Sequence, residues 1–506
     1  MILYRRDVTI FGERQTVNIT PLTLLVLLAI VLRIPSLFEP YWYGDEAIYL
    51  TLGEGIRQGL GLYKDIFDHK PPLIYLLAAV SGSLYWFKFA LLVSSTISIV
   101  LFWKLAKRIF EGKLPAIILA TTIFTLLATL PTLEGNIANA ELFMLAPTIG
   151  AFLLLSDPQK VNLRRTFFAG LLFSLSILYK VPGIFDLATI CTFWVFAIKS
   201  IRGFGRVLGY LVILFAGVLL PILAISIYFA AVGAWGPFVQ AVGLINVNYI
   251  SRWGTGGGGG SILANAFFVR SMVLVAVLGA TYIFKKYFSF QALFICLWMS
   301  FALFAALLSG RPYPHYLIQI IPAFSLAIAL LTFGKIRERL LPIPFLLILG
   351  FSVVFYKFSH YQTYPYYKNF ILMAVGQRSR EQYFSSFDSR VPKIYNVSSM
   401  LVSRTAPTDR VFIWGTAPEI YALSRRVPPV QYVTSFHIGD FGTSEETMRK
   451  LSLDKPKYVL IMPEETRTLT GLPKFLDTYY IYVENVDGVE VWKLMDPTIS
   501  KLLRNY

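Results

Sequence analysis

The chain has 506 residues, of which 56% are hydrophobic and only 15% are charged. Because about a quarter of the residues of soluble proteins are charged, this composition excludes an ordinary water-soluble protein. The net charge of +17 does not indicate nucleic-acid binding, since the basic residues lie in short groups between apolar runs and form no single stripe. The two cysteines, Cys191 and Cys296, lie inside apolar runs and imply no disulfide framework.

Apolar runs of roughly 17 to 25 residues, long enough to cross a hydrocarbon core about 30 Å thick, recur through the first two thirds of the chain. They predict a polytopic α-helical membrane protein. The first twenty residues lack a short apolar core followed by a cleavage site, so we expect no removable signal peptide. About eleven transmembrane helices are predicted, near 20–38, 88–107, 114–131, 138–155, 165–178, 183–199, 207–231, 267–285, 289–309, 315–334 and 341–357.

The basic residues between these runs predict the orientation, because Lys and Arg accumulate in cytoplasmic loops. With the N-terminus in the cytoplasm, the inner segments hold roughly eighteen basic residues and the outer loops roughly six. The segment Pro72–Trp86 is apolar but short, and a crossing there would turn the later basic groups outward. We therefore expect it to lie in or against the outer interface. The C-terminus is then extracytoplasmic, and the location is the inner or plasma membrane.

From about residue 360 the composition becomes that of a soluble protein. Arg410–Gly415 and Lys457–Met462 are typical of buried strands, and Tyr480–Val483 with Val489–Trp492 predicts a hairpin across Asp487-Gly488. Thr416-Ala417-Pro418-Glu419 predicts a helix start with a capping hydroxyl. We expect a membrane domain over 1–359, with a first outer loop at 39–87, and a small extracytoplasmic α/β domain over 360–506. The run Gly256–Gly260 lacks the Gly-Lys-Ser/Thr of a phosphate loop and predicts a flexible outer loop.

Ionisable residues gather in the predicted outer loops, where such residues at a membrane edge tend to mark function. The first outer loop carries two carboxylates at Asp45 and Glu46 and a second polar group at Asp68, His69 and Lys70. Vicinal carboxylates serve as a general base, as metal ligands or as simple solvated charges. The other outer loops add Glu134, Asn139, Glu141, Lys180, Arg311, Tyr313 and His315.

Cations beside carboxylates at one membrane face suit a substrate that carries a phosphate at the headgroup level. Each residue also has a plain structural interpretation. Lys180 and Arg311 are equally typical of anchors at helix ends, and His315 of a helix cap.

The order of these motifs resembles the membrane glycosyltransferases of the protein O-mannosyltransferase type, glycosyltransferase family 39. Bacterial relatives include the transferase that places aminoarabinose on lipid A. The matching stretches are Asp45-Glu46, His69-Lys70-Pro71-Pro72-Leu73, Asn139-Ala140-Glu141 and Arg311-Pro312-Tyr313-Pro314-His315-Tyr316. Many relatives have Glu before the lysine where this chain has His69.

The resemblance implies the GT-C fold and a mannosyltransferase-like hexosyl- or pentosyltransferase with a polyprenyl-phosphate sugar donor. It implies an extracytoplasmic acceptor (a protein, lipid or glycan), inversion at the sugar, Asp45 as general base and Lys70 as a contact to the donor phosphate. A divalent cation at Asp45 and Glu46 stays open, because a carboxylate pair alone does not establish one. Expected partners are the donor, the acceptor and membrane lipid, without nucleic acid.

Two other classes of function remain as alternatives. A transporter or flippase of a lipid-linked sugar would place its ionisable residues near the bilayer midplane, whereas here they lie at the outer ends of the predicted helices. A scaffold that recruits partners through its C-terminal domain would need none of this chemistry.

Overall fold

The structure is a computed structural model and describes residues 4–10, 13–156, 161–198, 200–246 and 266–496. The predicted Gly256–Gly260 loop lies outside these residues. The chain divides into two compact units, which we call the first and the second unit. The first unit comprises Met1–Ser36, Lys88–Ile225 and Asn246–Thr363, and the second comprises Leu37–Phe87, Ser226–Ile245 and Tyr364–Tyr506.

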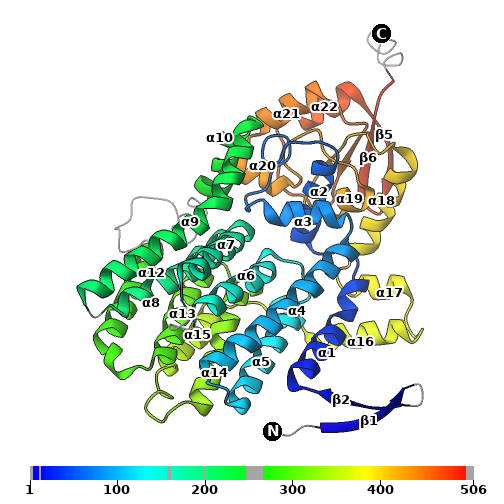
Figure 1. The fold of residues 1–506 in the computed structure, drawn as a ribbon. Coiled ribbons are helices and arrows are strands. Elements are labelled where there is room, and N and C mark those ends of the chain that lie inside the picture. The colour runs from blue at the N-terminus through cyan, green and yellow to red at the C-terminus, as the bar shows by residue number, and fades with distance from the viewer. Residues whose placement is uncertain (1–3, 11–12, 157–160, 199, 247–265, 497–506) are drawn as a thin grey trace. The chain divides into compact units, whose positions relative to one another are not determined.

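The first unit is a bundle of helices (Figure 1), preceded by an antiparallel hairpin of β1 (Tyr4–Ile10) and β2 (Glu13–Ile19). Short 3-10 turns lie at η1 (Ile34–Phe38), η2 (Pro131–Leu133), η3 (Val181–Gly183), η6 (Lys285–Tyr287) and η7 (Pro314–Ile320). Its α-helices are α1 (Pro21–Arg33), α4 (Leu84–Ile109), α5 (Leu114–Thr129), α6 (Ala140–Leu155), α7 (Leu163–Tyr179), α8 (Ile184–Phe196), α9 (Ile201–Ala231), α12 (Ala266–Phe284), α13 (Phe290–Leu307), α14 (Ile321–Phe333) and α15 (Ile343–Phe355).

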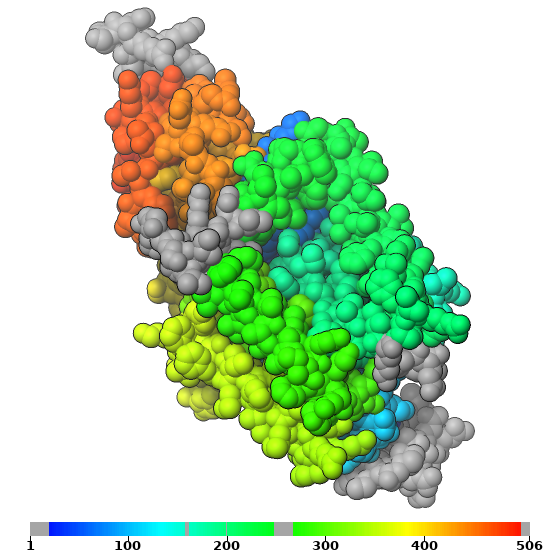
Figure 2. Space-filling view, turned by 90° about the vertical axis from the view of Figure 1, so that its left-hand side faces the viewer, coloured from blue at the N-terminus to red at the C-terminus, as the bar shows by residue number. Residues whose placement is uncertain are grey.

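Each of the eleven apolar segments predicted from the sequence overlaps one of these helices. In the described residues, 6 helical segments are long and apolar enough to cross a membrane, and four more are apolar but shorter. The chain is therefore a multi-pass membrane protein, while the number of spans stays a prediction. Side chains of α12 lie almost entirely on the surface, where Figure 2 shows them in bright green. Many are apolar, such as Val273, Val275 and Ile283, as contact with lipid requires.

Local sequence explains how the helices begin and pack. Thr20 caps α1 by accepting a hydrogen bond from the Thr23 N–H, with Pro21 as the first helical residue. Helices α7 and α9 cross closely at Gly170 and Gly217. A Cβ atom on Gly170 would lie 2.3 Å from the Leu214 carbonyl oxygen, and one on Gly217 would lie 2.3 Å from that of Phe167. Only glycine permits this approach, which is common between membrane helices.

The second unit combines short helices with one sheet. Its α-helices are α2 (Gly44–Arg57), α3 (Leu73–Ser81), α10 (Trp235–Val239), α16 (Thr363–Ala374), α17 (Arg380–Ser385), α18 (Val391–Arg404), α19 (Pro418–Ser424), α20 (Ser435–Phe441), α21 (Ser444–Leu453) and α22 (Leu472–Tyr479), and one π-helical turn, η4, covers Gln240–Leu244. Helix α3 has nine residues and is about 14 Å long, too short to cross a bilayer. The segment Pro72–Trp86 therefore does not form one spanning helix, whereas its place at the outer interface stays a prediction.

The sheet has the strand order β3-β4-β6-β5, with β3 (Val411–Trp414), β4 (Tyr458–Ile461), β5 (Tyr480–Val486) and β6 (Val489–Leu494). Strands β3 and β4 are parallel and β5 and β6 form an antiparallel hairpin, so the predicted strands are confirmed. All four residues of β3 are buried. The core beside the sheet includes Phe412, Val459 and Leu476.

The predicted capping hydroxyl of α19 is wrong. The residue before the helix is Ala417, which offers no side-chain cap, and Pro418 is the first helical residue. The Thr416 hydroxyl instead lies 3.1 Å from the Ser435 hydroxyl, so the side chain that could have capped α19 binds the start of α20.

Candidate functional site

The predicted site residues form two groups, one in each unit. The second unit holds Asp45, Glu46, Asp68, His69 and Lys70, and the first unit holds Asn139, Glu141, Lys180, Arg311, Tyr313 and His315. The two groups are described separately below.

In the second unit, Asp45 and Lys70 form an ion pair. Asp45 lies in the first turn of α2, where the helix dipole favours a negative charge, and its Oδ2 atom lies 3.4 Å from the Lys70 Nζ atom. The Tyr49 hydroxyl donates to the same oxygen at 3.2 Å, and the Lys70 ammonium lies 4.9 Å from the centre of the Tyr49 ring. The Asp45 side chain is 31% exposed, whereas Glu46 is buried. Of the two vicinal carboxylates, Asp45 is therefore the one that solvent or a substrate can reach.

Asp68 is the buried anchor of the loop that carries Lys70. Its Oδ2 atom accepts a hydrogen bond from the Tyr75 hydroxyl at 2.8 Å and lies 3.7 Å from Lys70 Nζ. The Tyr75 hydroxyl also accepts from the Lys70 backbone N–H at 3.1 Å. Burial alone would raise the pKa of Asp68, but the charges of Lys70 and His69 hold it well below its usual value. Asp68 is thus a buried carboxylate that keeps its charge and fixes the Lys70 backbone.

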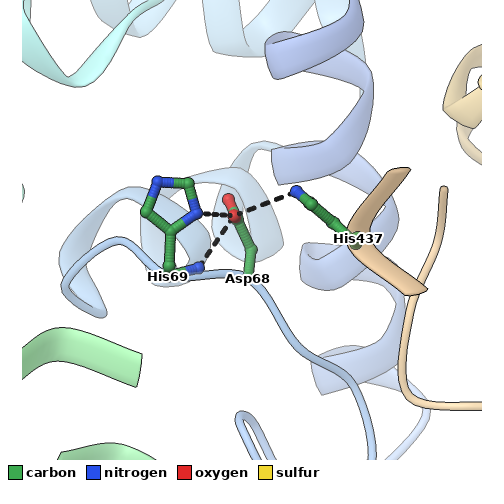
Figure 3. Close-up of side chains that lie close together, drawn as sticks. All are labelled: Asp68, His69 and His437. Carbon is green, nitrogen blue, oxygen red and sulfur yellow. Dashed lines mark hydrogen bonds and ion pairs between the residues drawn. The ribbon is translucent and has the colours of Figure 1, made fainter. Parts of the chain in front are cut away.

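A histidine that the sequence analysis did not single out completes this group. His437, the third residue of α20, is buried, and its Nε2 atom lies 3.7 Å from Asp68 Oδ1. His69 Nδ1 lies 2.9 Å from the same oxygen. In Figure 3 Asp68 lies between the two imidazoles, with His69 next to it on the same loop and His437 reaching from α20. Burial lowers the pKa of His437 to about 4 despite the nearby Asp68, so its imidazole is neutral at neutral pH.

The segment before α20 also forms hydrogen bonds with the loop that carries Lys70. The Phe67 N–H donates to the Gln431 carbonyl at 2.8 Å, and Gln431 Nε2 donates to the Tyr63 carbonyl at 2.7 Å. The Tyr63 hydroxyl donates to the Lys70 carbonyl at 2.7 Å. Hydrogen bonds from both sides therefore fix the backbone around Lys70. Nothing local in the sequence indicates that residues near 431 and 437 meet this loop.

In the first unit, His315 joins two acidic residues. Its Nδ1 atom lies 2.6 Å from Glu134 Oε2, and its Nε2 atom lies 3.6 Å from Glu141 Oε1. Asn139 Nδ2 donates to Glu134 Oε2 at 3.1 Å. Lys180 forms an ion pair with Glu141. All five side chains lie within one network, in which Glu141 neutralises the charge of Lys180.

The remaining predicted residues of the first unit border this network. The Tyr313 ring stacks on His315 with the ring centres 5.6 Å apart, and it is 45% exposed. Arg311 is partly exposed in the same loop, and its backbone N–H donates to the Ser309 hydroxyl at 3.3 Å. The loop before η7 and the first turn of η7 therefore carry Arg311, Tyr313 and His315, and their role in binding a substrate stays a prediction.

Two buried cations fix the loop between α5 and α6. Arg33 donates to the carbonyls of Gly135 at 2.6 Å and Ala128 at 2.7 Å, and Lys88 donates to that of Asn136 at 2.9 Å. Glu134 has a φ of 61°, a left-handed conformation that costs about 1–3 kcal/mol for a residue other than glycine. These hydrogen bonds hold the loop in the conformation that aims Glu134 at His315.

Replacement of Lys88 by Met should lower the thermal stability of the protein. The Asn136 carbonyl loses a charged donor in a buried place, which costs about 1–3 kcal/mol. The melting temperature in detergent, followed by intrinsic fluorescence, measures this loss. Lys104→Met is the matched control because Lys104 lies on the same helix and is exposed. Equal melting temperatures for both variants would contradict the role of Lys88.

Glu419 is a buried acid close to α2. The Thr51 hydroxyl donates to the neighbouring Pro418 carbonyl at 3.3 Å, and Glu419 Oε2 has no hydrogen-bond partner among the described residues. Burial raises the pKa of Glu419 from 4.5 to about 7. As the pH rises above 4.5, the unfolded chain gives up this proton and the folded chain keeps it until about pH 7. The stability contributed by Glu419 therefore falls across this window.

Replacement of Glu419 by Gln should remove that fall. Above pH 7 the ionised, buried carboxylate lowers the free energy of unfolding of the wild type by about 3 kcal/mol. The variant avoids this loss, so the variant should be more stable than the wild type at pH 8 and equally stable near pH 4. Melting temperatures across this pH range test the prediction, with the exposed Glu445→Gln as control. A parallel pH profile for wild type and Glu419→Gln would contradict it.

Among the described residues, one group has the composition and spacing to hold a metal ion: Asp68, His69 and His437, whose ligand atoms lie within 4.8 Å of one another. A cation at Asp45 and Glu46 stays a prediction. Because Glu46 is buried and Asp45 is partly exposed, the two side chains meet different surroundings.

Comparison with solved structures shows the fold. The structure is similar to that of ArnT from Cupriavidus metallidurans bound to undecaprenyl phosphate, with a TM-score of 0.55 and 15% sequence identity over 94% of this chain and 98% of that one. The oligosaccharyltransferase of Archaeoglobus fulgidus in its apo form aligns with a TM-score of 0.47 and 14% identity, over 94% and 74% of the two chains. No protein-family model matches the sequence, and no curated protein is found to be similar to it.

The chain therefore has the predicted GT-C fold, a helical membrane protein with a small C-terminal α/β part. At this level of identity the likeness extends to the fold alone. The roles of the site residues and the division at 359/360 stay predictions.

Proposed function

We propose that this membrane protein is a glycosyltransferase that moves a sugar from a polyprenyl-phosphate donor to an extracytoplasmic acceptor. The observation that carries the proposal is the pair of Asp45 and Lys70, a reachable carboxylate 3.4 Å from an ammonium that buried groups hold in place. A base and a phosphate contact side by side are what transfer from a lipid phosphate needs. The similarly folded ArnT is bound to undecaprenyl phosphate, which supports a donor of this class.

In the proposed step, an acceptor hydroxyl attacks the anomeric carbon of the donor sugar. Asp45 takes the hydroxyl proton as the new carbon–oxygen bond forms. The bond from the anomeric carbon to the phosphate oxygen breaks, and the polyprenyl phosphate leaves with the electron pair. Lys70 stabilises the charge that develops on this phosphate. Attack opposite the leaving group inverts the anomeric centre.

The other residues of the second unit position these two groups. Asp68 and Tyr75 fix the Lys70 backbone, and Tyr49 orients the Asp45 carboxylate. Glu46 is buried and is proposed to support the first turn of α2. In the first unit, we propose that Arg311 and Tyr313 contact substrate at the edge of the ion network, while Asn139, Glu141, Lys180 and His315 maintain its charge balance.

A transfer assay tests the proposal. The full chain in lipid nanodiscs is supplied with a panel of polyprenyl-phosphate sugars and with hydroxyl acceptors, and formation of polyprenyl phosphate and glycosylated product is followed by mass spectrometry. Turnover with at least one donor is expected, with product of inverted anomeric configuration. Movement of the lipid-linked sugar across a vesicle membrane without any transfer would instead establish the alternative flippase.

One buried acid could favour transport, since ionisable residues within membrane helices often line a substrate path. Asp186 lies in the first turn of α8 and is buried. Its Oδ1 atom accepts from Trp298 Nε1 at 2.8 Å, and its Oδ2 atom accepts from Gln319 Nε2 at 2.9 Å. With both oxygens bonded to neighbouring helices, Asp186 ties α8 to α13 and η7, which favours a structural role over a transport path.

The proposed orientation predicts the outcome of reporter fusions. A reporter fused after Tyr506 should be active only outside the cytoplasm, and one inserted in the basic segment between Lys199 and Arg206, where α9 begins, only inside, because basic segments stay in the cytoplasm. Paired alkaline phosphatase and fluorescent protein fusions measure both sides. A cytoplasmic C-terminus would contradict the proposed extracytoplasmic reaction.

A further inference from the structure

The proposed transfer gives no role to two imidazoles of the second unit, those of His69 and His437, which form a group with Asp68 (Figure 3). Asp68 divides its two carboxylate oxygens between different partners. Oδ2 binds Tyr75 and faces Lys70, while Oδ1 faces the two imidazoles. One oxygen and two imidazole nitrogens therefore converge away from the ammonium.

His437 makes this convergence chemically unusual. The side chain is 2% exposed, and its Nδ1 atom is buried without a hydrogen-bond partner among the described residues. Its Nε2 atom points at Asp68 Oδ1 at 3.7 Å, which is too long for a hydrogen bond. A metal ion between Nε2 and Oδ1 would bind both atoms at bonding distance.

The separations from Asp68 to the two imidazoles suit a small tetrahedral ion, and all three ligand atoms lie within 4.8 Å of one another. With metal–ligand bonds of about 2.0–2.1 Å, neighbouring ligand atoms of a tetrahedral zinc lie about 3.3 Å apart. The two measured separations from Asp68 Oδ1, 2.9 Å and 3.7 Å, lie on either side of this value. Two imidazoles beside one carboxylate favour zinc, whereas magnesium and calcium prefer all-oxygen sites.

We infer that Asp68, His69 and His437 form a zinc site, with one coordination position left for water. The site joins the loop that carries Lys70 to α20, two segments far apart in the sequence of the second unit. Zinc therefore acts as a clamp that adds to the hydrogen bonds of Gln431 with this loop. The inference does not rest on the proposed transfer, because metal binding is measured without a sugar donor.

The test uses the full chain, stripped with a chelator and then dialysed against zinc in the presence of excess magnesium. Metal content by mass spectrometry should give one zinc per chain, and cobalt in its place should produce the visible absorption of a tetrahedral ion. Zinc should also raise the melting temperature, because it binds the folded chain. Absence of stoichiometric zinc, or a cobalt spectrum of six-coordinate type, would overturn the inference.

Variants locate the site. His437→Ala and His69→Ala should each weaken zinc binding by more than about 100-fold, since even the loss of an outer-shell partner costs about 10–100-fold. His360→Ala is the matched control, because His360 is exposed and belongs to the first unit. His69 is partly exposed, so its variant is informative even where His437→Ala fails to fold. Unchanged zinc affinity in His69→Ala would show that zinc binds elsewhere and would refute the site.

Discussion

Replacement of Lys70 by Ala should reduce sugar transfer by about 100- to 1,000-fold, the usual cost of removing one group that stabilises developing charge. The loss should appear mainly in kcat, because the phosphate gains charge as the sugar leaves. Folding should change little, since the Lys70 backbone stays fixed by Tyr63 and Tyr75. Steady-state kinetics with a lipid-phosphate sugar measure the effect, together with the melting temperature.

Lys64→Ala provides the control for this variant, because Lys64 is an exposed lysine of the same loop. It should keep nearly full activity. Lys70→Arg should recover part of the lost rate, since it restores the positive charge with a different shape. Unchanged donor kinetics in Lys70→Ala would remove its phosphate role and leave a membrane-anchoring lysine.

The membrane part of the fold could be predicted because its signal is local. A run of about 20 apolar residues identifies a spanning helix without any knowledge of its neighbours, and all eleven predicted segments overlap a helix. The hairpin across Asp487-Gly488 was equally readable, since its turn residues lie between alternating strands. Lengths and ends were less predictable: the apolar segment 315–334 begins as the 3-10 turn η7 before α14.

The grouping of the C-terminal residues could not be predicted. Composition changes near residue 360, which suggested a boundary there. The structure places 37–87 and 364–506 in one compact unit, joined by contacts such as the hydrogen bond from Phe67 to Gln431. Backbone hydrogen bonds of this kind involve no particular side chain, so a single sequence carries no trace of them.

The part of the candidate site that lies in one segment of the chain was predictable, and the part that comes from a distant segment was not. Asp68, His69 and Lys70 are neighbours in the chain, and Asp45 lies on the preceding helix α2, within the same predicted outer loop. His437 carries no such signal. The one clue is that the chain has only 4 histidines. This clue is weak, because a histidine near the start of a helix in a soluble segment has many ordinary structural roles.

The departure of this chain at His69 gains a physical meaning from the structure. A glutamate at this position would place a second carboxylate beside buried Asp68. Like charges in a buried place are unfavourable, whereas the imidazole of His69 adds no negative charge and lies 2.9 Å from Asp68. Buried Asp68 is thus compatible with a histidine at position 69, and His437 is a second imidazole that faces the same carboxylate.

Replacement of Asp45 by Asn should abolish sugar transfer while donor binding survives. Asn keeps the size of Asp and can still accept a hydrogen bond from Tyr49, but it cannot take a proton at neutral pH. Loss of a general base costs typically about 100- to 10,000-fold in rate, the largest effect expected for any single residue of this chain. Single-turnover transfer and donor-induced thermal stabilisation, measured on the same preparation, separate chemistry from binding.

Two companion variants sharpen the result for Asp45. Asp65→Asn is the control, because Asp65 is exposed, and its one described hydrogen bond, which it accepts from the Gly61 N–H at 2.8 Å, is one that Asn can also accept. Glu46→Gln should lose less activity than Asp45→Asn if Glu46 only supports the first turn of α2, and about as much if the two carboxylates together hold a cation. Near-normal turnover by Asp45→Asn would exclude it as the base and direct attention to Glu46, Asp68 or Glu141, of which all three are buried and would need to open before an acceptor could reach them.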